Sequence, residues 1–239
     1  VYDTGTVVIV ETMGRNPGWL TAASTLASLS GAGPDLIYLP ERPFDLEQAL
    51  AQIQQVYQRR GNCLVALSEG VVDKEGKFIA EYGQDVATDA FGHKQMGGAG
   101  AFVAGEVKSR FGYKVRSIEL SLLQRCAAHC ASRTDIEEAY QAGKQAVELA
   151  VAGETDKMVS FQRRPGPDYA IDYVPAPLDI VANTEKKVPQ EWITPDGVGL
   201  TEDFIHYALP LIQGETELPY ENGLPRFAKL KKQRAGAGQ

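Results

Sequence analysis

One stretch near the start of the sequence constrains the fold more than any other. Thr6–Ala22 reads TVVIVETMGRNPGWLTA. Its uninterrupted run of β-branched residues, TVVIV, is typical of a strand buried on both faces. The following turn is supplied by Gly14 and Gly18, which accept backbone geometries closed to other residues, and by Pro17, which suits the first turn of a helix. The stretch therefore predicts a strand, a glycine-bearing turn and a helix over residues 19–30.

Arg15 lies in that turn. In doubly wound α/β proteins, ligands bind at the carboxyl edge of the sheet, where strands end and helices begin. A guanidinium beside the free N–H groups of a helix favours a phosphate or carboxylate ligand. The alternative is that Arg15 is a surface residue of an ordinary strand-to-helix loop, and the pattern alone does not separate the two interpretations.

The next segments continue the alternation of strands and helices. Residues 35–40 predict a short strand that a proline closes, and residues 62–67 predict a third strand. Between them, apolar residues at helical spacing predict a helix over Leu46–Arg60, capped by Asp45 and stopped by Gly61. Strands and helices in this order indicate βαβ units and a parallel sheet, hence an α/β fold.

The second half of the sequence is less regular. Residues 71–94 are polar and glycine-bearing, which is typical of a long loop that lies over a site or is mobile. The strongest helix signal spans Asp135–Val151, with Thr134 and Asp135 as candidate caps. We also expect helices at 97–111 and 203–213, strands at 113–120, 157–163 and 169–173, and a frayed tail from Phe227 to Gln239.

Composition narrows the class of protein. The net charge of −7 argues against general nucleic-acid binding, which needs a basic surface. The sequence has neither an apolar run of about 18 residues nor a charged-then-apolar leader, so we predict neither a membrane span nor a signal peptide. Three cysteines are too few and too odd in number for a disulfide framework, which favours a cytoplasmic location.

The letters of the first turn carry more information than its pattern. Glu11–Arg15 reads ETMGR and is followed after two residues by GWLTA. This segment closely resembles the M-G-R segment of the 6-phosphofructokinases, which lines the fructose 6-phosphate pocket in that family. The resemblance implies that Met13, Gly14 and Arg15 bind this sugar phosphate here.

Glu69 ends the third predicted strand, in the stretch ALSEG. A carboxylate at this place can accept hydrogen bonds from sugar hydroxyls, although without other context a cap facing solvent is the commoner role. Phosphofructokinases carry T-E-G or S-E-G at the corresponding strand end, and that Glu binds the hydroxyls of fructose 6-phosphate. The resemblance implies the same role for Glu69.

A third matching stretch, residues 116–125, reads RSIELSLLQR. Arg116 and Arg125 bracket a predicted strand and the turn after it, so together they could hold one phosphate from two sides. The family has an Arg nine residues before the Arg of its G-H-x-Q-R-G-G segment, and both contact the sugar phosphate, the earlier one across a subunit interface. The resemblance implies that Arg116, Gln124 and Arg125 bind substrate and that the protein is a homo-oligomer.

Departures from the family pattern point to one branch. Leu122 stands where many ATP-dependent members have His, Cys126 and Ala127 replace the two glycines, and Thr6 replaces a phosphate-binding Arg. These positions and the long C-terminal segment are more similar to the diphosphate-dependent branch. The donor, diphosphate or ATP, stays open because the residues that discriminate between them in the family lie in a segment absent from this sequence.

Two family segments do not occur in these residues. The donor-binding G-G-D and the T-I-D-N-D that supplies the catalytic Asp both precede M-G-R in the family. Phosphoryl transfer needs a base for the attacking hydroxyl and Mg²⁺ for the transferring phosphate. We therefore assign no catalytic residue, expect Mg²⁺ to be bound mainly by the absent segment, and expect this chain alone to be inactive.

Cys126, His129 and Cys130 are spaced so that they could face one way on a helix and hold zinc. No fourth ligand is evident, and packing in or beside a helix is the commoner fate of such residues. We therefore predict no metal site.

These matches identify the chain as the C-terminal portion of a 6-phosphofructokinase, a glycolytic enzyme that converts fructose 6-phosphate to fructose 1,6-bisphosphate. The family implies a three-layer αβα fold, here without its N-terminal part, and the opening with Val1 in place of Met agrees with this. We expect residues 1–125 to form most of the sugar-phosphate domain. Residues 126–165 would cross over to complete the donor-binding domain, and residues 166–239 would return.

Two alternatives remain open. One is a non-catalytic sugar-phosphate-binding or regulatory half of a phosphofructokinase assembly, which the sequence upstream of Val1 would decide. The other is an unrelated nucleotide-binding α/β protein. The lack of G-x-x-x-x-G-K-[ST] and G-x-G-x-x-G argues against the common versions of that class.

Overall fold

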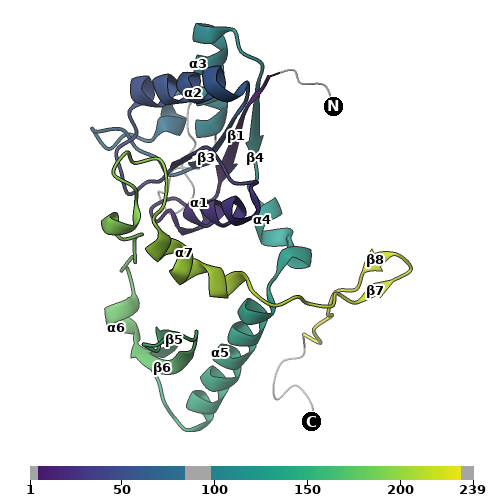
Figure 1. Cartoon of the computed structure of the whole chain (residues 1–239). Coiled ribbons are helices and arrows are strands. Elements are labelled where there is room, and N and C mark those ends of the chain that lie inside the picture. The colour runs from purple at the N-terminus through teal and green to yellow at the C-terminus, as the bar shows by residue number, and fades with distance from the viewer. Residues whose placement is uncertain (1–4, 84–97, 233–239) are drawn as a thin grey trace.

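The computed structural model describes residues 5–83 and 98–232. Figure 1 shows a sheet with helices on both faces at one end of the molecule, and a long helix beside a strand hairpin at the other. The chain leaves the first part through α4 (Leu123–Cys126) and comes back to it in α7 (Glu202–Ala208).

Within residues 5–83 and 98–232, four parallel strands form the main sheet. They are β1 (Val7–Thr12), β2 (Leu36–Tyr38), β3 (Cys63–Ser68) and β4 (Val115–Glu119), in the order β2-β3-β1-β4. The register pairs Val7 with both Cys63 and Val115, so β1, β3 and β4 end at one common edge. The predicted α/β fold with a parallel sheet is confirmed.

Helices cover both faces of this sheet. α2 (Leu46–Arg60) and α3 (Ala99–Phe111) pack on one face, and α1 (Trp19–Ala23), η1 (Ser24–Ser30) and α7 pack on the other. Ile9 of β1 and Ile53 of α2 are both fully buried in the first core. On the second face, Ile37 of β2 and Phe204 of α7 belong to one cluster. Each such side chain stabilises the fold by about 1.5–3 kcal/mol, and the layers have the predicted αβα order.

The ends of α2 follow from local chemistry. Asp45 Oδ1 accepts the backbone N–H of Gln48 at 2.9 Å and so satisfies one of the helix's free donors. Gly61 ends the helix in the left-handed region, with φ of 75°, where a side chain would be strained. Both predicted end signals are confirmed.

Two other predicted helices change type partway along. The helix expected over residues 19–30 begins as α1 and continues as the 3-10 helix η1. The helix expected over residues 203–213 is α7 followed by η5 (Leu209–Ile212). Ser24 Oγ donates to the carbonyl of Thr21 at 2.6 Å, a side-chain bond that competes with α-helical geometry. Pro210 lacks the N–H that would continue α7.

The other end of the molecule is built on α5 (Arg133–Val151) and on the antiparallel hairpin of β5 (Lys157–Arg163) and β6 (Ile171–Pro177). α5 contains no buried residue. The apolar side chains Ile136, Tyr140, Val147 and Val151 of this helix are exposed. The short segment η2 (Ile79–Tyr82) belongs to the first part, with Ile79 and Ala80 in its core. Three more short segments lie along the connections between the parts: η3 (Ala128–Cys130), α6 (Leu178–Val181) and η4 (Gln190–Trp192).

The predicted caps of α5 were wrong. The N-cap is Ser132, whose Oγ accepts the N–H of Asp135 at 3.1 Å and donates to the carbonyl of Leu211 at 2.6 Å. The sequence SRTD offers several residues able to cap, and the contact with Leu211, far along the chain, selects Ser132. Neither Thr134 nor Asp135 caps the helix.

The C-terminal residues form an arm. After η5 the chain extends away from both parts and makes the small hairpin of β7 (Tyr220–Glu221) and β8 (Leu224–Pro225) (Figure 1). The described part of the predicted tail, residues 227–232, has no regular structure, and residues 233–239 lie outside the described residues. Residues 84–94 of the predicted long loop also lie outside them.

None of the helices in the described part of the chain combines the length and the hydropathy needed to cross a membrane.

Candidate functional site

The segments that follow β1, β3 and β4 meet at the carboxyl edge of the sheet. Met13 donates its backbone N–H to Gln124 Oε1 at 2.7 Å, and Gly14 donates its own to Glu69 Oε1 at 3.1 Å. The backbone N–H of Glu69 in turn donates to the carbonyl of Thr12 at 2.9 Å. The structure therefore brings together four of the sequence-predicted site residues from three stretches far apart in the chain.

Gly70 lets two of these stretches touch backbone to backbone. A Cβ placed on Gly70 would lie 1.7 Å from the carbonyl oxygen of Arg15, closer than any real contact. Ser68 Oγ adds a hydrogen bond, donated to the carbonyl of Gly14 at 2.7 Å. The Gly of the S-E-G stretch is thus a packing requirement of the M-G-R turn.

Glu11 is a second carboxylate at this edge, and its side chain is buried, 2% exposed. Its oxygens accept the N–H groups of Gly98 at 3.0 Å and Gly100 at 2.7 Å, at the start of α3. Burial raises the pKa of the Glu11 carboxyl, and the two N–H groups oppose that rise. Glu11 therefore anchors α3 to the end of β1.

Glu11 has no role among the predictions made from the sequence. A signal was present, because a carboxylate between Val10 and Thr12 in a strand buried on both faces must find partners. The partners themselves, at Gly98 and Gly100, could not be inferred from spacing.

The three predicted phosphate-binding arginines differ in exposure and in their position relative to the carboxyl edge. Arg15 is half-buried in the first turn, and Arg125 is exposed on α4. Arg116 is exposed on β4 and lies opposite Val8, so it is about 13 Å along the strands from the carboxyl edge. The structure does not bring Arg116 to the cluster formed by the other residues.

The turn before α4 aims Gln124 at the first turn. Ser121 adopts φ of 41°, a left-handed conformation that costs a residue other than glycine about 1–3 kcal/mol. The turn closes with a hydrogen bond from the N–H of Gln124 to the carbonyl of Ser121 at 3.2 Å. This strained reversal directly follows β4 and places the Gln124 side chain against Met13.

Residues 185–188 lie beside the first turn, which the sequence did not indicate. Asn16 Nδ2 donates to Glu185, and Trp19 Nε1 donates to the carbonyl of Lys186 at 2.6 Å. Glu41 Oε1 accepts two backbone N–H groups, from Gly18 at 2.8 Å and from Val188 at 3.0 Å. The returning segment therefore helps to fix the turn that carries Arg15.

The described residues contain no group of three His, Cys, Asp or Glu side chains able to hold a metal ion. Cys126 and Cys130 are both exposed.

Comparison with known proteins gives the family. The sequence profile described as Phosphofructokinase matches residues 3–150. Two relatives are named pyrophosphate--fructose 6-phosphate 1-phosphotransferase. The protein from Halomonas elongata is 43% identical over 229 residues, which are 95% of this chain and 54% of that protein. The protein from Xanthomonas campestris pv. campestris is 46% identical over 235 residues, 96% of this chain and 55% of that protein.

The fold agrees with this match. The crystal structure of a pyrophosphate-dependent phosphofructokinase from Marinobacter aquaeolei superposes with a TM-score of 0.79 at 38% identity, over 95% of this chain and 53% of that one. The corresponding protein from Nitrosospira multiformis gives the same TM-score of 0.79. The chain spans about half the length of the curated relatives it matches. The sequence match, the fold and the cluster at the carboxyl edge together show that the chain belongs to the phosphofructokinase family.

Proposed function

We propose that this chain supplies the fructose 6-phosphate side of a diphosphate-dependent phosphofructokinase. The observation that carries the proposal is the junction at the carboxyl edge, where Gln124 binds Met13 and Glu69 binds Gly14. These contacts join the segments that the family uses to hold its sugar substrate. The names of the relatives support diphosphate as the donor.

The geometry suggests how the sugar is held. Glu69 Oε1 is occupied by the N–H of Gly14, and among the described residues no hydrogen bond is made to Oε2. Oε2 would accept sugar hydroxyls. Arg15 and Arg125 would hold the 6-phosphate with charge-assisted hydrogen bonds.

Arg116 would act on a second copy of the protein. It is exposed and lies about 13 Å from the edge where Met13 and Glu69 meet, so it cannot join the same phosphate within one chain. On the edge strand β4 it is available to a neighbouring subunit. A homo-oligomer with sites completed across an interface would follow.

The reaction of the whole enzyme is an in-line phosphoryl transfer. The 1-hydroxyl oxygen of fructose 6-phosphate attacks the terminal phosphorus of diphosphate, the bridging P–O bond breaks, and inorganic phosphate leaves. A base takes the hydroxyl proton. We place that base, and the Mg²⁺ that neutralises the diphosphate, in the half of the enzyme outside this chain, because the G-G-D and T-I-D-N-D segments that supply these functions in the family do not occur in this sequence.

We further propose the domain assignment that this division implies. Residues 1–125 would be most of the sugar-phosphate domain, 126–165 the crossover to the donor-binding domain, and 166–239 the return. The crossing at α4 and the packing of α7 on the four-stranded sheet support it. The exposed apolar face of α5 would then be covered by the donor-binding domain.

The test uses the whole enzyme with Arg125→Ala. Loss of a charge-assisted contact to the 6-phosphate should raise the KM for fructose 6-phosphate about 10- to 100-fold, with diphosphate as donor. The control is Arg164→Ala, which removes an exposed arginine paired with Asp172 on the hairpin and should leave KM unchanged. Unchanged kinetics in Arg125→Ala would remove this residue from the site.

Assays of the 239-residue chain by itself separate the enzyme from the regulatory half. We expect no turnover with fructose 6-phosphate, Mg²⁺ and either diphosphate or ATP, and turnover with diphosphate once the other half is joined to it. Turnover by the chain alone would mean that it contains a base. If the joined protein binds fructose 6-phosphate but still shows no turnover, a regulatory role is favoured.

A further inference from the structure

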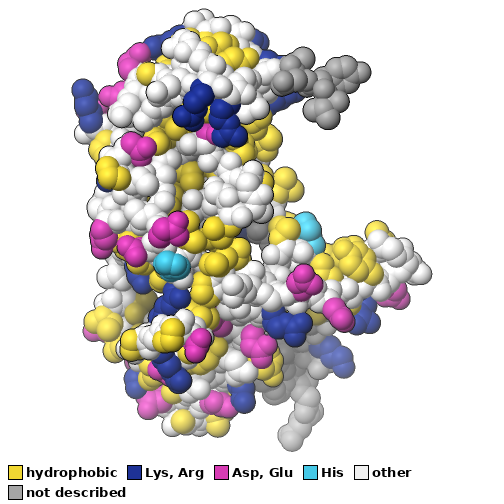
Figure 2. Space-filling model, viewed as in Figure 1, with side chains coloured by type: hydrophobic (Ala, Val, Ile, Leu, Met, Phe, Trp, Pro, Cys, Tyr) yellow, Lys and Arg dark blue, Asp and Glu magenta, His cyan; other side chains and the backbone are white. Residues whose placement is uncertain are grey.

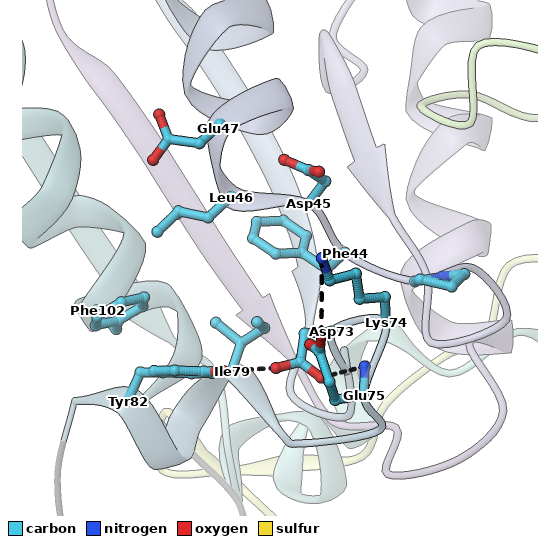
Figure 3. A pocket seen from close by; sticks show the side chains of 11 residues that line it. Phe44, Asp45, Leu46, Glu47, Asp73, Lys74, Glu75, Ile79, Tyr82 and Phe102 are labelled. Carbon is cyan, nitrogen blue, oxygen red and sulfur yellow. Dashed lines mark hydrogen bonds and ion pairs between the residues drawn. The ribbon is translucent and has the colours of Figure 1, made fainter.

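A pocket of about 350 Å³ lies on the side of the sheet covered by α2 and α3. Figure 3 shows that its walls come from the first turn of α2, the loop after β3, η2 and α3. Phe44 and Ile79, 5% and 3% exposed, form the floor. Tyr82 and Phe102 form a stacked aromatic wall with ring centroids 5.9 Å apart. The interior is therefore apolar, with room for a large side chain.

The rim of this pocket is acidic. Asp45, Glu47, Asp73 and Glu75 line it together with Lys74 (Figure 3). Two of these carboxylates have cationic partners, Glu47 in Arg110 at 2.5 Å and Glu75 in Lys74 at 3.7 Å, and Lys77 lies over the Tyr82 ring. Asp73 is fixed in place by the hydroxyl of Tyr82 at 2.6 Å and by the N–H of Glu75 at 2.9 Å. The carboxylates still outnumber these cations, so the rim keeps a net negative charge, which favours a cationic group attached to an apolar body over a sugar phosphate or a nucleotide.

The C-terminal arm has the complementary chemistry. Every residue from Pro219 to Lys232 is exposed. Its last described stretch, residues 226–232, reads RFAKLKK and alternates apolar with basic side chains. Phe227 is 72% exposed and Leu230 is 84% exposed. Figure 2 shows hydrophobic and basic side chains together on this protrusion.

The arm and the pocket lie at opposite parts of the molecule. The pocket belongs to the sheet end, whereas the arm extends from the junction near α5 to the other side (Figure 1). The hydrogen bond from the N–H of Arg226 to the carbonyl of Pro219 runs within the arm. The exposed apolar and basic segment 226–232 of one copy can thus reach the acid-rimmed apolar pocket of another.

We propose that residues 226–232 of one copy dock into the pocket of a second copy, with Phe227 inserted against Phe44 and Ile79. The flanking Arg226 and Lys229 then lie against the carboxylates of the rim. Apolar insertion gives affinity, and the charge pattern gives orientation. This inference is independent of the reaction proposed above.

A peptide experiment tests the recognition. A fluorescein-labelled peptide of residues 224–232 is titrated into the chain shortened to end at residue 225, and binding is followed by anisotropy. We expect saturable binding whose affinity falls as the salt concentration rises. The Phe227→Ala peptide should bind with an affinity lower by about tenfold or more. Glu75→Lys in the shortened chain should also weaken binding, whereas Glu191→Lys, an exposed acid on η4, should not.

A second experiment tests whether docking occurs between copies. The shortened chain, with its pocket intact, is immobilised, and the full chain carrying Glu75→Lys, with its arm intact, is passed over it. The immobilised chain has a pocket but no arm, and the mobile chain has an arm but an impaired pocket. A complex between them must therefore use the arm of the mobile chain and the pocket of the immobilised one. We expect a complex that Phe227→Ala in the mobile chain weakens by about tenfold.

The outcomes decide the proposal. Failure of the peptide to bind, or binding that ignores both Phe227→Ala and Glu75→Lys, overturns it. Peptide binding without complex formation between the two chains overturns docking between copies. Binding of a simple hydrophobic amine with higher affinity than the peptide would assign the pocket to a small cationic ligand and likewise overturn the proposal.

Discussion

At the scale of single residues, Gly70 shows how one missing side chain sets the geometry of the site. A methyl group on Gly70 would collide with the backbone of Arg15, because its Cβ would lie 1.7 Å from the Arg15 carbonyl oxygen and 2.4 Å from the carbonyl carbon. Because both partners are backbone, no side-chain rotation relieves the clash.

We therefore predict that Gly70→Ala lowers the free energy of unfolding by about 3 kcal/mol or more. The measurement is urea unfolding followed by far-UV circular dichroism. Gly105→Ala is the matched control, because a Cβ at Gly105 meets nothing within 4 Å and the residue lies inside α3. It should stabilise the chain by about 0.5–1 kcal/mol. Equal effects from the two substitutions would contradict the close approach at Gly70.

Glu11 makes stability depend on pH. Burial raises its pKa above the ordinary value of 4.5, so the folded state holds this proton more tightly than the unfolded state. The resulting stabilisation is present below pH 4.5 and is lost as pH rises through the raised pKa.

The test compares the free energy of unfolding of the wild type and of Glu11→Gln as a function of pH. From about pH 4.5 upward, the wild type should lose stability relative to Glu11→Gln, whose amide does not titrate. The substitution also weakens the bonds to Gly98 and Gly100, which shifts its profile by a constant amount. Profiles that stay parallel would show that Glu11 has an ordinary pKa in the folded state.

At the scale of elements, α5 depends on the residue that caps it. Ser132 caps the helix and also holds η5 through Leu211, while α5 itself buries no side chain. Such a helix gains little from packing, so its cap carries a large share of its stability.

We expect Ser132→Ala to cost about 0.5–2 kcal/mol of stability and to lower helical content. Thr201→Ala is the control, because Thr201 stands at the N-cap of α7 without a side-chain cap bond, and its buried Oγ1 has no hydrogen-bond partner within the described part of the chain. Thermal unfolding followed at about 222 nm compares the two. A smaller loss from Ser132→Ala than from Thr201→Ala would remove the capping role.

Local signals predicted elements well, and long-range contacts explain what they missed. Asp45 and Gly61 mark the ends of α2 because a cap bond and a left-handed residue act within one turn of the chain. The choice of Ser132 depends on Leu211, which no local pattern contains.

The site shows the same division. The carboxyl-edge rule for parallel sheets, with the family resemblance, correctly predicts that Met13, Glu69 and Gln124 lie together. It could not show that Arg116 lies opposite Val8, away from that edge, because the rule places strand ends and not residues within a strand. The rule also could not predict the hydrogen bonds between Glu11 and the start of α3, because Gly98 and Gly100 lie far from Glu11 in the sequence.

At the scale of the whole molecule, the two parts are unequally packed. β1 and β3 bury most of their side chains, whereas α5, β5 and β6 bury none fully. The second part is held to the first by contacts such as the bond from Arg163 to the carbonyl of Tyr207 at 2.7 Å.

This difference predicts a gradient of hydrogen exchange. Amides of β1 and β3 should exchange only through global unfolding, and those of α5, β5 and β6 at least about tenfold faster through local opening. Mass spectrometry of the 239-residue chain after timed exchange in deuterated buffer measures both. Equal protection in the two parts would show that they unfold as one cooperative unit.

The strand order has a consequence for how the chain folds. β1 is the first of the four sheet strands to be made, yet it lies between β3 and β4 and pairs with Cys63 and Val115. The long chain segments that separate β1 from β3 and from β4 must close before both sides of β1 are paired. Closing them costs conformational entropy and slows folding. During that interval its apolar run stays open to other chains. Refolding should therefore compete with aggregation, and the recovered yield should fall as the protein concentration rises.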